Sequence, residues 1–327
     1  MKALKGRKSW TILTALVLIL GLGASQAWAW GSATHTYIDD QLNRQGHGQK
    51  NLGEMYGGVA PDLFNYLFAP YQPYLYGLTH DDFLKVWEAA GPGLSSVKRA
   101  LAYGFVSHND HWGADVTAHH NGLTFGQGQG YVIAKAQAMK PYLITTLASM
   151  GIALPDTVAM DLSHNFVEYG VDVLVKNLDA RVGAKMAGAA LKRNPTFPAL
   201  LVQAYGDDVA AHLSISRKEA AQLILKAEQS FRKTKIYEGQ ALMQDDAAAI
   251  ALLAEELADF AQAYLASFNV TLPPGVGREQ IVGLVEKFIG LAIDMCKGDF
   301  AQEITATIAY VNEQLDTHGI AYGGPPR

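Results

Sequence analysis

Cysteine is almost absent from this chain, since Cys296 is the only one among 327 residues. A single thiol cannot form a disulfide within the chain, and it excludes a zinc site built on several cysteines. The alternation of apolar and polar residues that marks strands is missing over any useful length, and no internal repeat is present. Beyond the first thirty residues, no apolar run reaches the ~20 residues that a membrane-spanning helix needs. These absences predict an all-α protein that is stabilised by a large apolar core or by bound metal.

The first 29 residues have the pattern of a secretory signal peptide. Four basic residues precede an apolar run over residues 10–24, and an Ala-x-Ala cleavage site ends at Ala29. The run is short for a transmembrane helix, and an uncleaved N-terminal anchor is the alternative. Cleavage between Ala29 and Trp30 predicts a secreted or periplasmic protein.

Basic residues are scarce in the expected mature chain. Cleavage removes four basic residues and no acidic residue, so 26 basic residues become 22 against 31 acidic residues, and the formal net charge becomes −9. An acidic chain disfavours binding to nucleic acid or to an anionic membrane through charge alone. The sequence therefore gives no strong indication of a nucleic-acid partner.

Histidine, by contrast, is concentrated in residues 108–120, which hold four of the ten histidines of the chain. His111, Asp115 and His119 are spaced four apart, and this spacing places them on one face of a helix. The apolar residues 97–106 predict a helix that runs into this stretch. Imidazole and carboxylate groups on one helix face are an arrangement typical of metal ligands. The alternative is a polar helix face that hydrogen-bonds to its neighbours.

Further candidate ligands lie on both sides of this stretch. His164 and Glu168 form a second pair with the same spacing. Asp62 follows two glycines and a proline, which predicts a tight loop that directs its carboxylate, with an ordinary turn as the alternative. His80 is expected at the start of a helix that runs to residue 90. His35 lies five residues after the expected free amine, and an α-amine with its own carbonyl can chelate a metal.

Residues 64–76 contain six aromatic residues and two prolines, and no lysine or arginine. This composition fits neither a helix nor a regular strand. It predicts a loop that forms a substrate rim or a peripheral contact with a membrane. The alternative is a segment that simply covers the core.

The later chain has helical periodicity throughout. The predicted organisation is a signal peptide over residues 1–29, a metal-binding catalytic core over 30–180, a helical part packed on or extending that core over 181–318, and a tail over 319–327. The predicted helices cover residues 132–150, 183–192, 197–213, 216–233, 243–268, 278–297 and 299–315.

Taken together, these residues resemble the zinc-dependent phospholipase C family, whose fold is shared with the single-strand-specific zinc nucleases. Residues 114–119 look closest to the catalytic domain of glycosylphosphatidylinositol-specific phospholipase D and its bacterial relatives. The resemblance covers residues 30 to about 180. It is carried by a terminal tryptophan, an early histidine, a loop aspartate and the two spaced pairs. The matching positions are Trp30, His35, Asp62, His80, His111, Asp115, His119, His164 and Glu168.

Two positions stay open in this match. His108 follows Gly-Phe-Val-Ser, as in the phospholipase D branch, and competes with His111. Seven residues separate His108 from Asp115, which is ~10 Å along a helix and long for one shared metal, so His111 is preferred. His120 lies beside His119 and is the second alternative.

The resemblance implies a cluster of three Zn²⁺ ions in an all-α fold. One zinc would be bound by Asp62, His80, His111 and Asp115. A second would be bound by His119, His164 and Glu168. The third would take the amine and carbonyl of Trp30, with His35 and with Asp115 as a bridge. Asp62 would be the catalytic base that orients the attacking water.

The implied function is a secreted zinc-dependent phosphodiesterase that hydrolyses phospholipid or a related phosphodiester. The first alternative is a single-strand-specific nuclease of the same fold. The acidic chain and the lack of basic residues in 64–76 tilt the expectation toward lipid. The second alternative is a non-enzymatic helical protein that is stabilised by zinc and binds a partner through its C-terminal half.

Overall fold

The computed structural model describes residues 30–42, 49–65, 72–91, 97–268, 270 and 272–320. Within these ranges every regular element is a helix, so the all-α prediction is confirmed. The helices that surround the central histidine stretch and precede it are α2 (Ser32–Leu42), α3 (Gln49–Val59), the 3₁₀ helix η1 (Ala60–Phe64), α4 (Gln72–His80), α5 (Leu84–Ala90), α6 (Val97–His108) and α7 (Ala114–His119). Those that follow are α8 (Tyr131–Ser149), α9 (Asp156–Val175), α10 (Val182–Leu191), α11 (Phe197–Leu213), α12 (Arg217–Leu242), α13 (Asp246–Ser267), α14 (Arg278–Cys296) and α15 (Phe300–Thr317).

Some predictions fall on residues outside the described ranges. The expected signal peptide over residues 1–29, the middle of the aromatic segment at 66–71 and the tail at 321–327 are among them. No helix in the described part of the chain is both long and apolar enough to cross a membrane.

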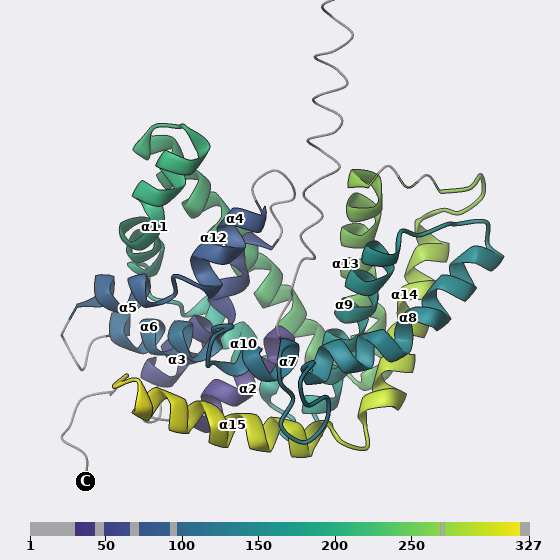
Figure 1. Cartoon of the computed structure of the whole chain (residues 1–327), viewed down its shortest axis with the longest axis horizontal. Helices are drawn as coiled ribbons and strands as arrows, with labels where there is room; N and C mark the ends of the chain where they lie inside the picture. The colour runs from purple at the N-terminus through teal and green to yellow at the C-terminus, as the bar shows by residue number, and fades with distance from the viewer. Residues whose placement is uncertain are drawn as a thin grey trace, which may run out of the picture.

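The helices form two packed groups with two helices between them (Figure 1). One group contains α3, α5, α6, α11 and α12, and the other contains α8, α9, α13 and α14. Helices α2 and α7 lie between these groups, and α15 runs along one side, where it contacts α2, α7 and α9. A single apolar core, which extends in sequence from Trp30 to Ile320, joins all of them.

The later helices agree closely with those predicted from periodicity. The predicted range 197–213 is the range of α11, and 278–297 differs from α14 by one residue. Helix α12 begins with a capping box, in which Ser216 and Glu219 bond to each other's backbone N–H. It runs on to Leu242, beyond the predicted end at 233, because no residue after 233 breaks the helix.

The glycines before Asp62 are not in a loop, so that prediction is wrong. Gly57 and Gly58 lie inside α3, and η1 follows directly. A Cβ atom at Gly57 would overlap the carbonyl of Leu101 in α6, and one at Gly104 would overlap the carbonyl of Glu54 in α3. The glycines therefore allow two helix backbones to pack closely, and this contact fixes the position of Asp62.

The prediction for His80 is also wrong in its local structure. His80 is the last residue of α4, and α5 is a separate helix that begins at Leu84. Residues 72–76 of the aromatic segment are helical as well, since α4 begins at Gln72. The aromatic residues Tyr74 and Tyr76 therefore occupy one helix with His80, and Tyr76 is one turn before it.

Candidate metal centre

The central histidine stretch contains a turn between two helices. Asn109 produces this turn, because its Oδ1 accepts hydrogen bonds from the backbone N–H groups of His111, Trp112 and Gly113 at 2.9, 2.9 and 3.2 Å. Helix α6 ends before the turn and α7 begins after it. The prediction of one continuous helical face is therefore wrong.

The turn reverses the roles expected for His108 and His111. The His111 side chain is 55% exposed and lies 3.1 Å from Asp81 at the surface, so the structure does not bring it to the other candidate ligands. His108 is fully buried, and its Nε2 lies 2.9 Å from Oδ2 of Asp115. The ~10 Å separation that a continuous helix would impose does not apply, since the chain turns between these residues.

Five buried side chains converge from five helical elements into what we call the first ligand group. Nε2 of His35 lies 3.0 Å from Oδ1 of Asp115. Nε2 of His80 lies 3.1 Å from Nε2 of His108 and 3.5 Å from Oδ1 of Asp62. Two overlapping sets of these residues have ligand atoms close enough to hold a metal ion. The first ligand group is His35, Asp62, His80, His108 and Asp115.

The two central imidazoles are oriented by backbone carbonyls. Nδ1 of His108 donates to the carbonyl of Gly58 at 2.7 Å, and Nδ1 of His80 lies 3.0 Å from the carbonyl of Tyr76. A carbonyl only accepts, so the proton is on Nδ1 in both neutral rings, and Nε2 presents a lone pair to the group. This is the orientation in which histidine binds metal, with the other ring nitrogen held by a backbone carbonyl.

The charges in the first ligand group favour a cation at its centre. Burial lowers the pKa of His108, but the charges of Asp115 and Asp62 outweigh burial and raise it to about 9. Burial would raise the pKa of Asp115, yet the charge and hydrogen bond of His108 lower it. Burial and the charge of His108 lower the pKa of His35. In the metal-free protein, one proton on His108 therefore offsets part of the charge of the two buried carboxylates Asp62 and Asp115, and a metal ion can take its place.

A second ligand group consists of His119 at the end of α7 with His164 and Glu168 on α9. Nε2 of His164 lies 3.6 Å from Oε1 of Glu168, and the rings of His119 and His164 are 5.2 Å apart. The spacing of four on α9 predicted this pair correctly as neighbours on one helix face. One atom from each of the three residues lies within 4.8 Å of the others, so this group could hold a metal ion.

The second ligand group contains buried polar atoms that no described residue satisfies. They are Nε2 of His119, both ring nitrogens of His164 and Oε1 of Glu168. Burial and nearby His119 lower the pKa of His164, while burial and the charge of Asp62 raise that of Glu168. Buried polar atoms are normally paired, so this set fits a bound cation. Imidazole nitrogen and carboxylate oxygen are ligands that zinc accepts.

His120 does not join the second ligand group. Its side chain is 57% exposed, and its Nε2 lies 3.4 Å from Oδ1 of Asp110, on the other side of His119. Asp110, His119 and His120 are close enough to form a further candidate site. That site would need a lone pair on Nδ1 of His119, which instead faces Asp110 at 2.9 Å. His119 cannot in its neutral form offer both nitrogens as ligands, so we assign it to the second ligand group.

Trp30 lies against the helix that carries Asp115 and His119. Its indole Nε1 donates to the carbonyl of Ala114 at 3.1 Å and lies 2.9 Å from the hydroxyl of Thr117. These contacts place Trp30 next to the candidate ligands but do not test its amine. The third zinc site, with Trp30, His35 and Asp115, stays a prediction.

The sequence did not predict the residues that support the ligands. Asp172, one turn after Glu168, accepts from the N–H groups of Ala33 and Thr34 at 2.9 and 2.8 Å and so fixes the start of the helix that carries His35. Glu303 on α15 is fully buried and binds the backbone N–H groups of residues 123–125, after α7. Both pair with residues more than a hundred positions away, and no local pattern marks them.

No protein-family model, curated protein or solved structure matches this chain. Eight of the ten predicted ligands lie in groups that could hold a metal ion, and the exceptions are Trp30 and His111. The buried groups therefore define the site by their own geometry.

Proposed function

We propose that this protein is an exported zinc-dependent phosphodiesterase of the phospholipase C type. The observation that carries the proposal is the second ligand group, where His119, His164 and Glu168 converge with unpaired buried atoms. It lies close to the first ligand group, because Asp115 of the first group and His119 of the second are one turn apart on α7. Neighbouring metal sites of this kind support in-line displacement at phosphorus.

Asp62 is the residue we assign as the base. Its Oδ1 accepts a hydrogen bond from Asn65 at 2.8 Å and faces His80 and His108, which leaves Oδ2 to take a proton. Its side chain is 12% exposed, whereas that of Asp115 is fully buried, so Asp62 is the carboxylate that solvent can reach. Bound zinc would supply Lewis-acid chemistry at the phosphoryl oxygens and lower the pKa of water toward ~7.

The choice of phospholipid as substrate rests on the resemblance and on the acidic mature chain. A membrane contact through the aromatic segment 64–76 would have to come from residues other than Phe64 and Tyr76, since Phe64 is buried and Tyr76 packs on His80. The signal peptide would place the enzyme outside the cytoplasm. Zinc is proposed because the ligands of both groups are nitrogen and oxygen atoms, with three imidazoles in the first group and two in the second.

A combined assay tests the proposal. Metal content is measured by elemental analysis on the mature protein, and hydrolysis is measured on bis-p-nitrophenyl phosphate, phosphatidylcholine vesicles and single-stranded DNA. We expect bound zinc, hydrolysis of the first two substrates, loss of activity on chelation and recovery on adding Zn²⁺. Hydrolysis of DNA instead of lipid would establish the nuclease alternative. Retained metal without hydrolysis would establish a zinc-stabilised binding protein, and absence of metal would refute the proposal.

A further inference from the structure

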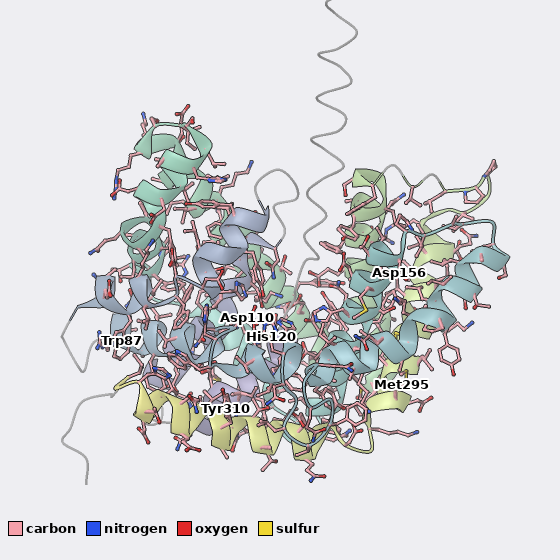
Figure 2. All side chains as sticks on the ribbon, in the orientation of Figure 1. Trp87, Asp110, His120, Asp156, Met295 and Tyr310 are labelled. Atoms are coloured by element: carbon pink, nitrogen blue, oxygen red, sulfur yellow. The ribbon has the colours of Figure 1, made fainter. Side chains whose placement is uncertain are left out.

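Asp110 contacts His119 of the second ligand group and Tyr76, which packs on His80 of the first ligand group. It occupies the turn between α6 and α7, and Figure 2 shows it with His120 at the centre of the molecule, near α7. Its Oδ1 lies 2.9 Å from Nδ1 of His119, and its Oδ2 accepts a hydrogen bond from the hydroxyl of Tyr76 at 2.6 Å. One carboxylate oxygen of Asp110 therefore contacts a ligand of the second group, and the other contacts a neighbour of the first group.

The contact with His119 orients a ligand of the second group. A carboxylate accepts, so the proton on Nδ1 of His119 points to Asp110 and the lone pair on Nε2 points toward His164 and Glu168. A carboxylate partner on the outer ring nitrogen of a histidine fixes the ring orientation and makes the inner nitrogen a better metal ligand.

The contact with Tyr76 reaches a ligand of the first group. The ring of Tyr76 stacks on the imidazole of His80 with centroids 3.7 Å apart and an interplanar angle of 12°. The carbonyl of Tyr76 also lies 3.0 Å from Nδ1 of His80. Tyr76 thus holds His80 through its ring and its backbone, and its hydroxyl is fixed by Asp110.

We propose that Asp110 is a positioning residue that couples the two metal sites. It orients His119 directly and His80 through Tyr76, so a metal bound at either group stabilises the carboxylate position that the other group needs. Such a coupling is reciprocal, because each site changes the affinity of the other by the same factor. The inference rests on the metal binding proposed above, and it does not depend on which phosphodiester is hydrolysed.

The test uses Asp110→Asn, Tyr76→Phe and the double variant in the mature protein. Asparagine keeps the shape of the side chain but loses its charge, and phenylalanine keeps the ring that stacks on His80. Asp81→Asn is the matched control, since Asp81 is an aspartate that contacts the exposed His111 at 3.1 Å and touches neither group. Zinc titration gives the affinities, and imidazole nitrogen NMR reports His80 and His119 separately. Thermal melting of each metal-free variant establishes that it is folded.

We expect Asp110→Asn to weaken zinc at the second group by about 10- to 100-fold, the range for outer partners of metal-bound histidines. It should also weaken the first group, by a smaller factor. Tyr76→Phe should weaken zinc binding at the first group and, because the Asp110 carboxylate loses one of its two partners, weaken the second group by a smaller factor. In the Tyr76→Phe background, Asp110→Asn should no longer affect the first group. Asp81→Asn should match wild type at both.

Several outcomes would overturn the inference. Wild-type affinities at both groups in Asp110→Asn would show that Asp110 positions nothing. If Asp110→Asn lowers zinc affinity at the first group equally in the wild-type and Tyr76→Phe backgrounds, the charge of Asp110 acts through space and not through Tyr76. A metal-induced shift at Nδ1 of His119 in the wild-type protein, and none at Nε2, would show that the ion lies on the Asp110 side and that Asp110 is itself a ligand. If the wild-type protein binds no metal, the proposed function itself is refuted, and the results of the variants are not needed to decide this.

Discussion

Replacing His108 by alanine should damage the metal centre, whereas the same change at His111 should not. His108 is fully buried and belongs to both sets of the first ligand group that could hold a metal ion. His111 is three residues away in the same motif, but its side chain is more than half exposed. The pair therefore compares the same substitution of the same residue type inside and outside the proposed centre.

The size of the effect follows from what His108 contacts. Its pKa of about 9, against an ordinary value of 6.5, corresponds to about 3 kcal/mol of net stabilisation of the charged imidazole in the metal-free protein, after the cost of burial is included. Removing one member of a buried ion pair leaves the other uncompensated, and this costs about 3–5 kcal/mol. Both values predict that metal-free His108→Ala loses about 3–5 kcal/mol of unfolding free energy.

Zinc affinity should fall as well. Losing an outer partner of a ligand costs about 10–100-fold, so losing a direct ligand should cost at least about 100-fold. His111→Ala removes a surface pair with Asp81, which is worth about 0–1 kcal/mol, and a ring contact with Phe83, and it should keep wild-type zinc affinity. Urea unfolding of the metal-free proteins and zinc titration of the folded ones measure both effects. Equal losses in the two variants would refute the assignment of His108 over His111.

The remaining predictions concern the supports of the site and its dependence on pH. Gly58→Ala would overlap the carboxylate of Asp39 and displace the carbonyl that orients His108, so we expect about 1–3 kcal/mol of destabilisation in urea unfolding and weaker zinc binding. Glu303→Gln removes the charge that binds three backbone N–H groups, so we expect it to lower the free energy of unfolding by about 1.5–3 kcal/mol and to lower the melting temperature. Glu313→Gln, on the exposed face of the same helix, should leave both unchanged. Zinc must displace the proton of His108, so apparent zinc affinity should rise with pH up to about 9 and then level off, with protons released on binding. The stability of the metal-free protein should change with pH in the opposite direction. The stabilisation that protonated His108 provides is complete below pH 6.5 and is lost as pH rises through about 9. A zinc affinity independent of pH between 6 and 9 would contradict this assignment.

The helices themselves could be predicted from the sequence because their causes are local. The apolar period that identifies α11 or α14 lies within the helix, and the ligand spacing of His164 and Glu168 needs only one helix to be correct. The same spacing gave a wrong prediction for His111, because α6 ends at His108 and α7 begins only at Ala114. Asn109 caps the N–H groups that follow it, and the segment Asn-Asp-His-Trp-Gly has a turn composition that was available in the sequence.

The supports of the site could not be predicted, because they depend on packing. Asp172 caps a helix more than a hundred residues before it, and Asp110 joins Tyr76 to His119. The pair Gly57–Gly58 has the composition of a loop, but the small size of Gly57 allows α3 to pack closely on α6. Each of these roles appears only when distant segments are placed side by side.

Anomalous diffraction at the zinc edge, on crystals of the mature protein grown with Zn²⁺, tests the central claim most directly. We predict one peak between Nε2 of His80 and Nε2 of His108, within bonding distance of Asp115, and a second peak among His119, His164 and Glu168. His111 should be far from any peak. Absence of a peak at the second ligand group would contradict the account, because its unpaired buried atoms are the reason for proposing a metal centre.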